Sequence, residues 1–169
     1  HKVVESKNED NFISCLSWDR KGKNLTIGNF EGCVKVLDFE KNKEIAKFND
    51  HTERVGALSI FDNLLLTGSR DSIIYLYDLR LKAKPIKSFD SHNQEVCGIK
   101  WSPTGRYFAS GGNDNKLFIF SPQTENPIYK KTHRAAVKAL DWSNNSINLL
   151  ASGSGSADRN LRIFNTDKN

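Results

Sequence analysis

The chain has 169 residues, with 25 Lys and Arg against 20 Asp and Glu, so its formal net charge is +5. Its hydrophobic fraction of 37% is low for a globular domain, but antiparallel sheets tolerate this because alternate side chains of their strands can face water. No run approaches the roughly 18 consecutive apolar residues of a membrane span, and no signal peptide is visible at the start. Composition is therefore compatible with an antiparallel β protein, and no membrane segment is expected.

The elements that the sequence predicts are short strands, and helical spacing fits none of them. Lys2–Glu5 is interpreted as the outer strand of a structural unit that precedes the repeats described below. Ser102-Pro103-Thr104-Gly105 has the residues of a hairpin turn, with Pro at its first central position. Alternation or apolar runs predict, in chain order, strands over 12–18, 45–48, 86–89, 96–101, 107–110, 116–120, 127–131 and 137–142.

A pattern of about 40 residues recurs four times. His51, His92 and His133 are each 41 residues apart, and so are Trp101 and Trp142. The recurring text reads LTIGNFEGCVKVLD, LLTGSRDSIIYLYD, FASGGNDNKLFIFS and LASGSGSADRNLRIFN. This period, with four short strands per unit, is typical of a β-propeller blade. The sequence predicts an all-β, partial WD-repeat β-propeller over 1–169, with repeats at about 8–48, 51–89, 92–131 and 133–165.

The recurrent histidines could indicate a metal or catalytic site, but a structural role explains them better. In a blade, the loop His can hydrogen-bond to a Ser or Thr of the second strand and to an Asp of the following turn, and each bond contributes about 1 kcal/mol. With one histidine per blade, the three should lie too far apart to share a metal. The predicted networks are His51 with Thr67 and Asp71, His92 with Ser110 and Asp114, and His133 with Ser152 and Asp158.

Catalysis has little support in the sequence. No GxxxxGK[ST] loop occurs, and Gly111, Gly112, Gly153 and Gly155 are interpreted as turn residues that supply permissive φ angles. We predict no enzyme, no cofactor and no metal. The paired basic residues fall between apolar runs without interleaved aromatics, so nucleic-acid binding is not expected either.

The three cysteines are an odd number without a CxxC pair. Cys15 and Cys97 lie inside apolar runs, where cysteine acts as a small hydrophobic residue. This usage suits a reducing compartment and predicts a nuclear and cytoplasmic location.

Two stretches are more specific than a WD repeat requires, namely HNQEVCGIKWSPTGRYFASGGNDN at 92–115 and HRAAVKALDWSNNSINLLASGSGSADRNLRIFN at 133–165. Together with HTERVGALS and LLTGSRDS in the preceding repeat, they resemble the Fizzy family over about 11–165. That family comprises WD-repeat co-activators and substrate receptors of the anaphase-promoting complex, a ubiquitin ligase. The resemblance implies degron-bearing partners of the cyclin or securin kind, subunits of the complex and checkpoint proteins.

The resemblance also implies a seven-bladed propeller of which this chain matches the second to fifth blades. The family's destruction-box groove, between first and last blades, should then be absent. Part of the face that binds the Lys-Glu-Asn (KEN) degron should be present.

The loop before each first strand and the turn between second and third strands should emerge on one face. Polar residues expected there without a structural contact are Arg54, Arg70, Gln94, Asn113 and Ser156. Asn113 and Ser156 match positions that the family uses for the KEN peptide, and Ser156 stands where the family has Thr. An Asn amide can donate and accept hydrogen bonds, and an Arg can pair with the degron's Glu. Each of these five residues could instead be an ordinary exposed turn residue without a role in binding.

Two other functions stay open at this point. One is a scaffold propeller without degron preference, and the other is a basic nucleic-acid-binding β domain. Self-association through open blade edges is a further possibility, and the two Fizzy subfamilies are not separated.

Overall fold

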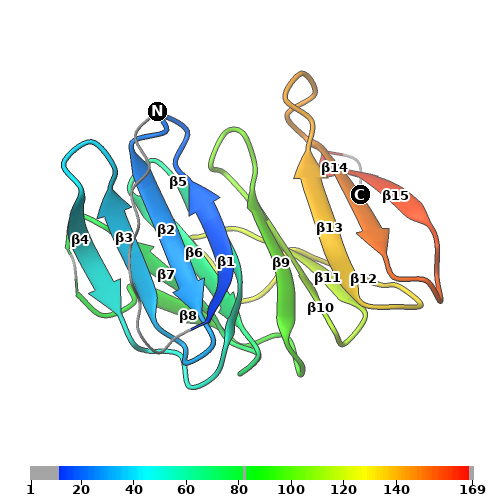
Figure 1. Ribbon diagram of the computed structural model, residues 1–169. Helices are drawn as coiled ribbons and strands as arrows, with labels where there is room; N and C mark the ends of the chain where they lie inside the picture. Colours follow the sequence, from blue (N-terminus) through cyan, green and yellow to red (C-terminus); the bar gives the residue numbers. More distant parts are fainter. Residues whose placement is uncertain (1–11, 82, 168–169) are drawn as a thin grey trace.

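The computed structural model describes residues 12–81 and 83–167, and within these ranges every regular element is a β-strand (Figure 1). None of the described residues forms a helix long and apolar enough to cross a membrane. The predicted strand Lys2–Glu5 lies outside the described residues. The fifteen strands are β1 Ile13–Trp18, β2 Asn24–Asn29, β3 Val34–Asp38, β4 Lys43–Phe48, β5 Val55–Phe61, β6 Leu64–Ser69, β7 Ile74–Asp78, β8 Lys87–Phe89, β9 Val96–Trp101, β10 Phe108–Gly112, β11 Lys116–Phe120, β12 Tyr129–Thr132, β13 Val137–Trp142, β14 Leu149–Ser154 and β15 Leu161–Asn165.

The strands form four antiparallel sheets, each of which follows the chain order. They are β1-β2-β3-β4, β5-β6-β7-β8, β9-β10-β11-β12 and the three-stranded β13-β14-β15. Figure 1 shows them side by side, from the blue first sheet to the orange and red last one. The first strands β1, β5, β9 and β13 contact one another in succession, so they line the inner side of the array. This is the arrangement of successive propeller blades, and the all-β WD-repeat fold predicted from the repeat is confirmed.

The strands β5 and β10 show how the burial of side chains differs between a first and a second strand of a sheet. Along β5, Val55 and Ala57 are buried while their neighbours are half-exposed. All five residues of β10 are buried, because β10 is flanked by β9 and β11 within its sheet and by other sheets on its faces.

The core lies between the sheets. Phe108 of β10 is fully buried and packs against Phe89 of the preceding sheet with ring centroids 5.0 Å apart. Phe120 of β11 stacks on Phe108 at 5.0 Å. Burying aromatic rings of this size dominates the energetics of a core, so each pair of sheets is held chiefly by apolar side chains.

Several strand boundaries differ from the sequence prediction. β9, β11 and β13 have the predicted bounds. β10, however, extends to Gly112 rather than ending at Ser110, because Gly111 pairs with both Gly98 and Leu117. The outer strand β12 begins at Tyr129 rather than at residue 127, where a proline has no N–H for the ladder.

The predicted turn at 102–105 is present. The Gly105 amide donates to the Ser102 carbonyl at 3.0 Å, and Gly105 has a φ of 68°. An added Cβ would also lie 2.3 Å from the Phe61 ring. Glycine is therefore required at this position by conformation and by space.

Candidate peptide-binding site

The structure brings each predicted His network together. In the third sheet, His92 Nε2 lies 2.8 Å from Ser110 Oγ, and Nδ1 lies 3.0 Å from Asp114 Oδ1. His92 is only 4% exposed and Ser110 is fully buried. Burial alone would raise the pKa of the Asp114 carboxyl, but hydrogen bonds from His92 and two backbone amides hold that pKa below its ordinary value. The second sheet repeats this geometry, with Nε2 to Oγ1 at 2.7 Å and Nδ1 to Oδ2 at 2.9 Å among His51, Thr67 and Asp71.

The network of the fourth sheet contains an additional cation. His133 lies 3.2 Å from Ser152 Oγ and 3.3 Å from Asp158 Oδ2. Arg162 donates to Asp158 and to His133 Nδ1, both at 2.5 Å. Burial, reinforced by the Arg162 guanidinium, lowers the pKa of His133 below its ordinary value. A neutral His133 that accepts at Nδ1 is the consistent arrangement.

These networks shape the turns at the face that carries Asn113. A Cβ added to Gly112 would lie 2.6 Å from His92 Nδ1, and one added to Gly111 would lie 2.4 Å from the Val137 carbonyl. Neither glycine has a positive φ, and the same holds for Gly153 and Gly155. The prediction that these four glycines supply permissive turn angles was therefore wrong. Close packing is what requires Gly111 and Gly112.

Within the part of the chain that the structure describes, the histidines are not gathered with other candidate metal ligands. Over residues 12–81 and 83–167, no group of three or more His, Cys, Asp or Glu side chains could hold a metal ion. The three networks belong to three different sheets.

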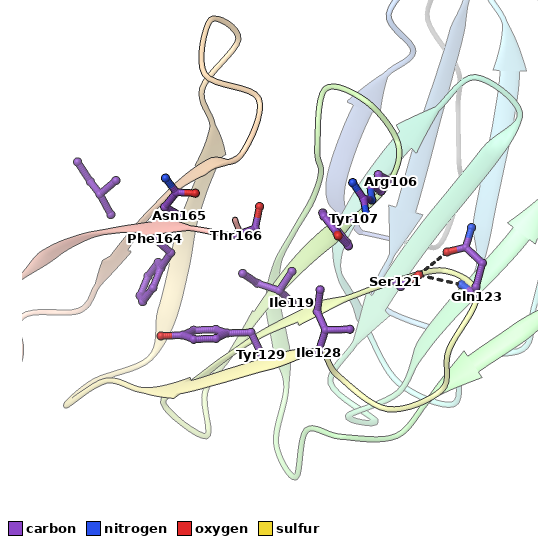
Figure 2. Close-up of a pocket in the computed structure, with 11 residues that line it drawn as sticks. Arg106, Tyr107, Ile119, Ser121, Gln123, Ile128, Tyr129, Phe164, Asn165 and Thr166 are labelled. Atoms are coloured by element: carbon purple, nitrogen blue, oxygen red, sulfur yellow. Dashed lines mark hydrogen bonds between the residues drawn. The ribbon is translucent and has the colours of Figure 1, made fainter. Parts of the chain in front are cut away.

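One cavity lies between the last two sheets, away from every predicted site residue. It measures about 820 Å³. Figure 2 shows the Tyr129 and Phe164 rings next to each other on one side of it, with centroids 5.6 Å apart, and Ser121 donating to Gln123 on the other side. Apart from Arg106, its lining residues are neutral. Because none of the predicted site residues lines this cavity, we place the candidate site elsewhere.

A smaller cavity of about 340 Å³ lies where the four inner strands meet their loops. All four sheets or their adjoining loops contribute to it, and it combines two cations, a carboxylate, an amide and a thiol beside an apolar wall. This inner pocket is lined by Ile13, Ser14, Phe30, Arg54, Gly56, Glu95, Cys97, Asn113 and Lys138.

Arg54 and Glu95 form the central ion pair of the inner pocket. Arg54 Nε donates to Glu95 Oε1 at 2.9 Å and Nη2 donates to Oε2 at 2.7 Å. The Glu95 side chain is 10% exposed and that of Arg54 is 37% exposed. The hydrogen bonds from this pairing raise the pKa of Arg54. Because the contact is bidentate, it fixes the orientation of both side chains.

Asn113 joins this pair through its amide. Its Nδ2 donates to Glu95 Oε2 at 3.4 Å, and its Oδ1 accepts from the Cys97 thiol at 3.1 Å. Burial raises the pKa of Cys97, which keeps the thiol protonated as a donor. The expectation that Arg54 and Asn113 lack structural contacts was therefore wrong. The amide still has one N–H and one acceptor position for a ligand.

The other three predicted residues lie outside the inner pocket. Arg70 is exposed and pairs with Glu53 at 3.3 Å. Gln94 is exposed in the loop before β9. Ser156 is exposed in the turn before β15, where its carbonyl accepts from Arg159 at 2.9 Å. They belong to the same loops and turns, but the structure does not gather them with Asn113.

Sequence reasoning missed Glu95 and Lys138, although a signal for Glu95 was present. Arg54 and Glu95 are 41 residues apart, which is the repeat period, so they occupy equivalent positions in successive blades. Opposite charges at equivalent positions just before adjacent inner strands indicate an ion pair across the blades. Lys138 stands 41 residues after Cys97 and gave no comparable signal.

Comparisons with known proteins support the fold and identify the family. The WD domain, G-beta repeat family matches residues 83–121 and 125–165, and the anaphase-promoting complex subunit 4 WD40 domain family matches residues 1–63. The B-type cell cycle switch protein ccs52A of Medicago truncatula is 42% identical over 161 residues, covering 95% of this chain and 34% of that protein. Protein FIZZY-RELATED 1 of Arabidopsis thaliana is 40% identical over 161 residues, with the same coverage of 95% and 34%. The chain belongs to the Fizzy family.

Other matches extend this family assignment. The anaphase-promoting complex subunit cdc20 of Dictyostelium discoideum is 37% identical over 169 residues, covering 98% of the chain and 34% of that protein. A chain in the crystal structure of a mitotic checkpoint complex superimposes with a TM-score of 0.92 at 34% identity, covering 96% of this chain and 52% of that one. The present Fizzy-family chain thus spans about a third of the length of the curated relatives it matches.

Proposed function

We propose that this chain contributes the degron-reading face of a co-activator of the anaphase-promoting complex. In that role it helps to select proteins for ubiquitin-dependent degradation during the cell cycle. The observation that carries the proposal is the inner pocket, in which an oriented Asn113 amide lies beside the Glu95 carboxylate and the Lys138 ammonium. The Asn113 amide and the Lys138 ammonium complement an extended peptide that carries an amide and an acidic side chain, both of which a Lys-Glu-Asn degron contains.

Family membership gives the proposal its biological setting. Relatives are named as a cell cycle switch protein and an anaphase-promoting complex subunit. Partners of this chain would then be degron-bearing proteins, subunits of that complex and checkpoint proteins, met in the nucleus and cytoplasm. Ser156, Arg70 and Gln94 would contact the parts of such a partner that extend beyond the inner pocket. The role is one of binding rather than catalysis.

The test is a fluorescence-anisotropy titration of the 169-residue chain with a labelled Lys-Glu-Asn peptide. Binding should disappear when the three residues are replaced by alanine. Asn113→Ala should weaken it about tenfold, as expected for one lost hydrogen bond of about 1.4 kcal/mol. Asn63→Ala is the matched control, because Asn63 is an exposed asparagine in the β5–β6 turn, at the opposite end of the strands. Equal affinity for the Lys-Glu-Asn and triple-alanine peptides would reject the proposal.

The second candidate function is a scaffold without degron preference. The exposed apolar side chains on the two outermost sheets favour it, among them Trp18, Leu161 and Ile163. These faces could receive another protein or a second copy of the chain. Affinity capture that recovers neither ligase subunits nor mitotic substrates would support this reading. Light scattering that shows only monomer would exclude self-association through the open edges.

A further inference from the structure

Arg54 is held on two sides and spans three blades. Its guanidinium carbon lies 5.3 Å from the centroid of the Phe30 ring, which belongs to the turn after β2. On the other side it makes the bidentate contact with Glu95, which immediately precedes β9. An arginine fixed between an aromatic face and a carboxylate has little freedom to reorient.

The charge of Arg54 is also neutralised within the protein itself. Glu95 neutralises it at hydrogen-bond distance, and the same carboxylate accepts from Asn113. A ligand carboxylate that displaced Glu95 from Arg54 would leave a nearly buried carboxylate without its partner. One that approached the remaining N–H groups of Arg54 would meet a guanidinium whose charge Glu95 already neutralises. The structure therefore argues against the expectation that Arg54 pairs with an acidic residue of a bound peptide.

Lys138 is the second cation of the inner pocket, and its situation differs. It is exposed on β13, on the far side of Cys97 from Arg54's sheet. Over residues 12–81 and 83–167, no ion pair occupies its ammonium group, whereas Lys100 of β9 is paired with Asp141 at 3.4 Å. Lys138 has a free charge and enough length to meet a peptide carboxylate at the mouth of the pocket.

We propose that Arg54 and Glu95 are positioning residues that orient the Asn113 amide, and that Lys138 supplies the charge that reads an acidic side chain of the bound peptide. The inference rests on the proposed function, whose site it resolves into two roles. It predicts that Lys138 distinguishes an acidic from a neutral peptide residue, while Arg54 affects every peptide equally.

The test is a matrix of two peptides and four proteins, measured by fluorescence anisotropy. The peptides contain Lys-Glu-Asn or Lys-Gln-Asn, and the proteins are wild type, Lys138→Met, Arg54→Met and Lys100→Met. Wild type should prefer the Lys-Glu-Asn peptide by about three- to tenfold, the discrimination expected of a partly exposed charge-assisted contact. Lys138→Met should abolish this preference and leave affinity for the Lys-Gln-Asn peptide unchanged. Arg54→Met should weaken the binding of both peptides by the same factor. Lys100→Met should leave the affinity for both peptides unchanged.

A second measurement tests positioning without a ligand. The side-chain amide resonances of Asn113, assigned by comparison with Asn113→Ala, should shift in Glu95→Gln and in Arg54→Met. They should stay in place in Lys138→Met. Urea unfolding of each variant separates loss of orientation from loss of the fold.

The outcomes distinguish the inference from the function on which it rests. A wild-type protein that ignores the Lys-Glu-Asn triplet refutes the proposed function and the reading role of Lys138 with it. A preference for the acidic peptide that survives Lys138→Met and vanishes in Arg54→Met refutes the inference alone. Unshifted Asn113 resonances in Arg54→Met refute the positioning role.

Discussion

Replacing His92 by alanine should destabilise the protein and disturb the turn that carries Asn113. His92 joins Ser110 of β10 to Asp114 of the β10–β11 turn. Within the described residues, the Ser110 hydroxyl has no other hydrogen-bond partner, and Ser110 is fully buried. A buried hydroxyl left without a hydrogen-bond partner lowers the free energy of unfolding by about 1–3 kcal/mol.

The cost at the other end of the network is smaller. Asp114 retains the amide of Lys116 at 3.1 Å and that of Asn93 at 3.2 Å, so losing His92 removes only a net contribution of about 1 kcal/mol there. The sum is roughly 2–4 kcal/mol, which corresponds to a fall of roughly 1–2 M in the urea midpoint at an unchanged slope.

The assay is urea unfolding followed by tryptophan fluorescence, applied to His92→Ala, Ser110→Ala and the double variant. If the orphaned hydroxyl carries much of the cost, the double variant should be more stable than the sum of the single changes predicts, by about 1 kcal/mol. A loss below about 0.5 kcal/mol in His92→Ala, or strict additivity in the cycle, would refute the reasoning.

Two further predictions follow from packing and charge. Gly111→Ala should lower the free energy of unfolding by about 1–3 kcal/mol, because its Cβ would lie 2.4 Å from the Val137 carbonyl. Gly153→Ala, at the equivalent position of the next blade, should lower it less, because its Cβ meets only a side chain at 3.3 Å. Equal melting temperatures of the two variants would contradict this. Because burial and Arg162 lower the pKa of His133 below 6.5, the unfolded state binds the proton more readily, so stability should be fully present above about pH 6.5 and decline as the pH falls through that value. Urea midpoints at successive pH values should show this decline in wild type and a weaker one in His133→Gln, and identical profiles would count against it.

The sequence was most informative about the local structure. Alternation in Val137–Trp142 and the 41-residue spacing of the histidines are properties of the chain itself. Because a blade is a local meander whose strands follow one another, the order of strands in each sheet follows from the order in the chain. The partners of His51, His92 and His133 could be named for the same reason, since each network closes within one blade.

The end of β10 was misjudged because glycine has two uses that sequence alone does not distinguish. Gly111 continues the ladder with ordinary φ, and it is glycine because the backbone of Val137 approaches it closely. That approach comes from the neighbouring blade. A local pattern carries no information on it.

The amino-acid sequence by itself determined the repeat, the strands and the hydrogen-bond networks within each blade, because all of these depend on residues separated by less than one period. The make-up of the inner pocket was decided only by the tertiary structure. Arg54, Asn113 and Lys138 belong to three different sheets, and packing of the inner strands around a common side brings them together. This packing pairs Arg54 with Glu95, although the sequence alone suggested a free cation. It also places Lys138 at the pocket, where no ion pair with another described residue neutralises its charge.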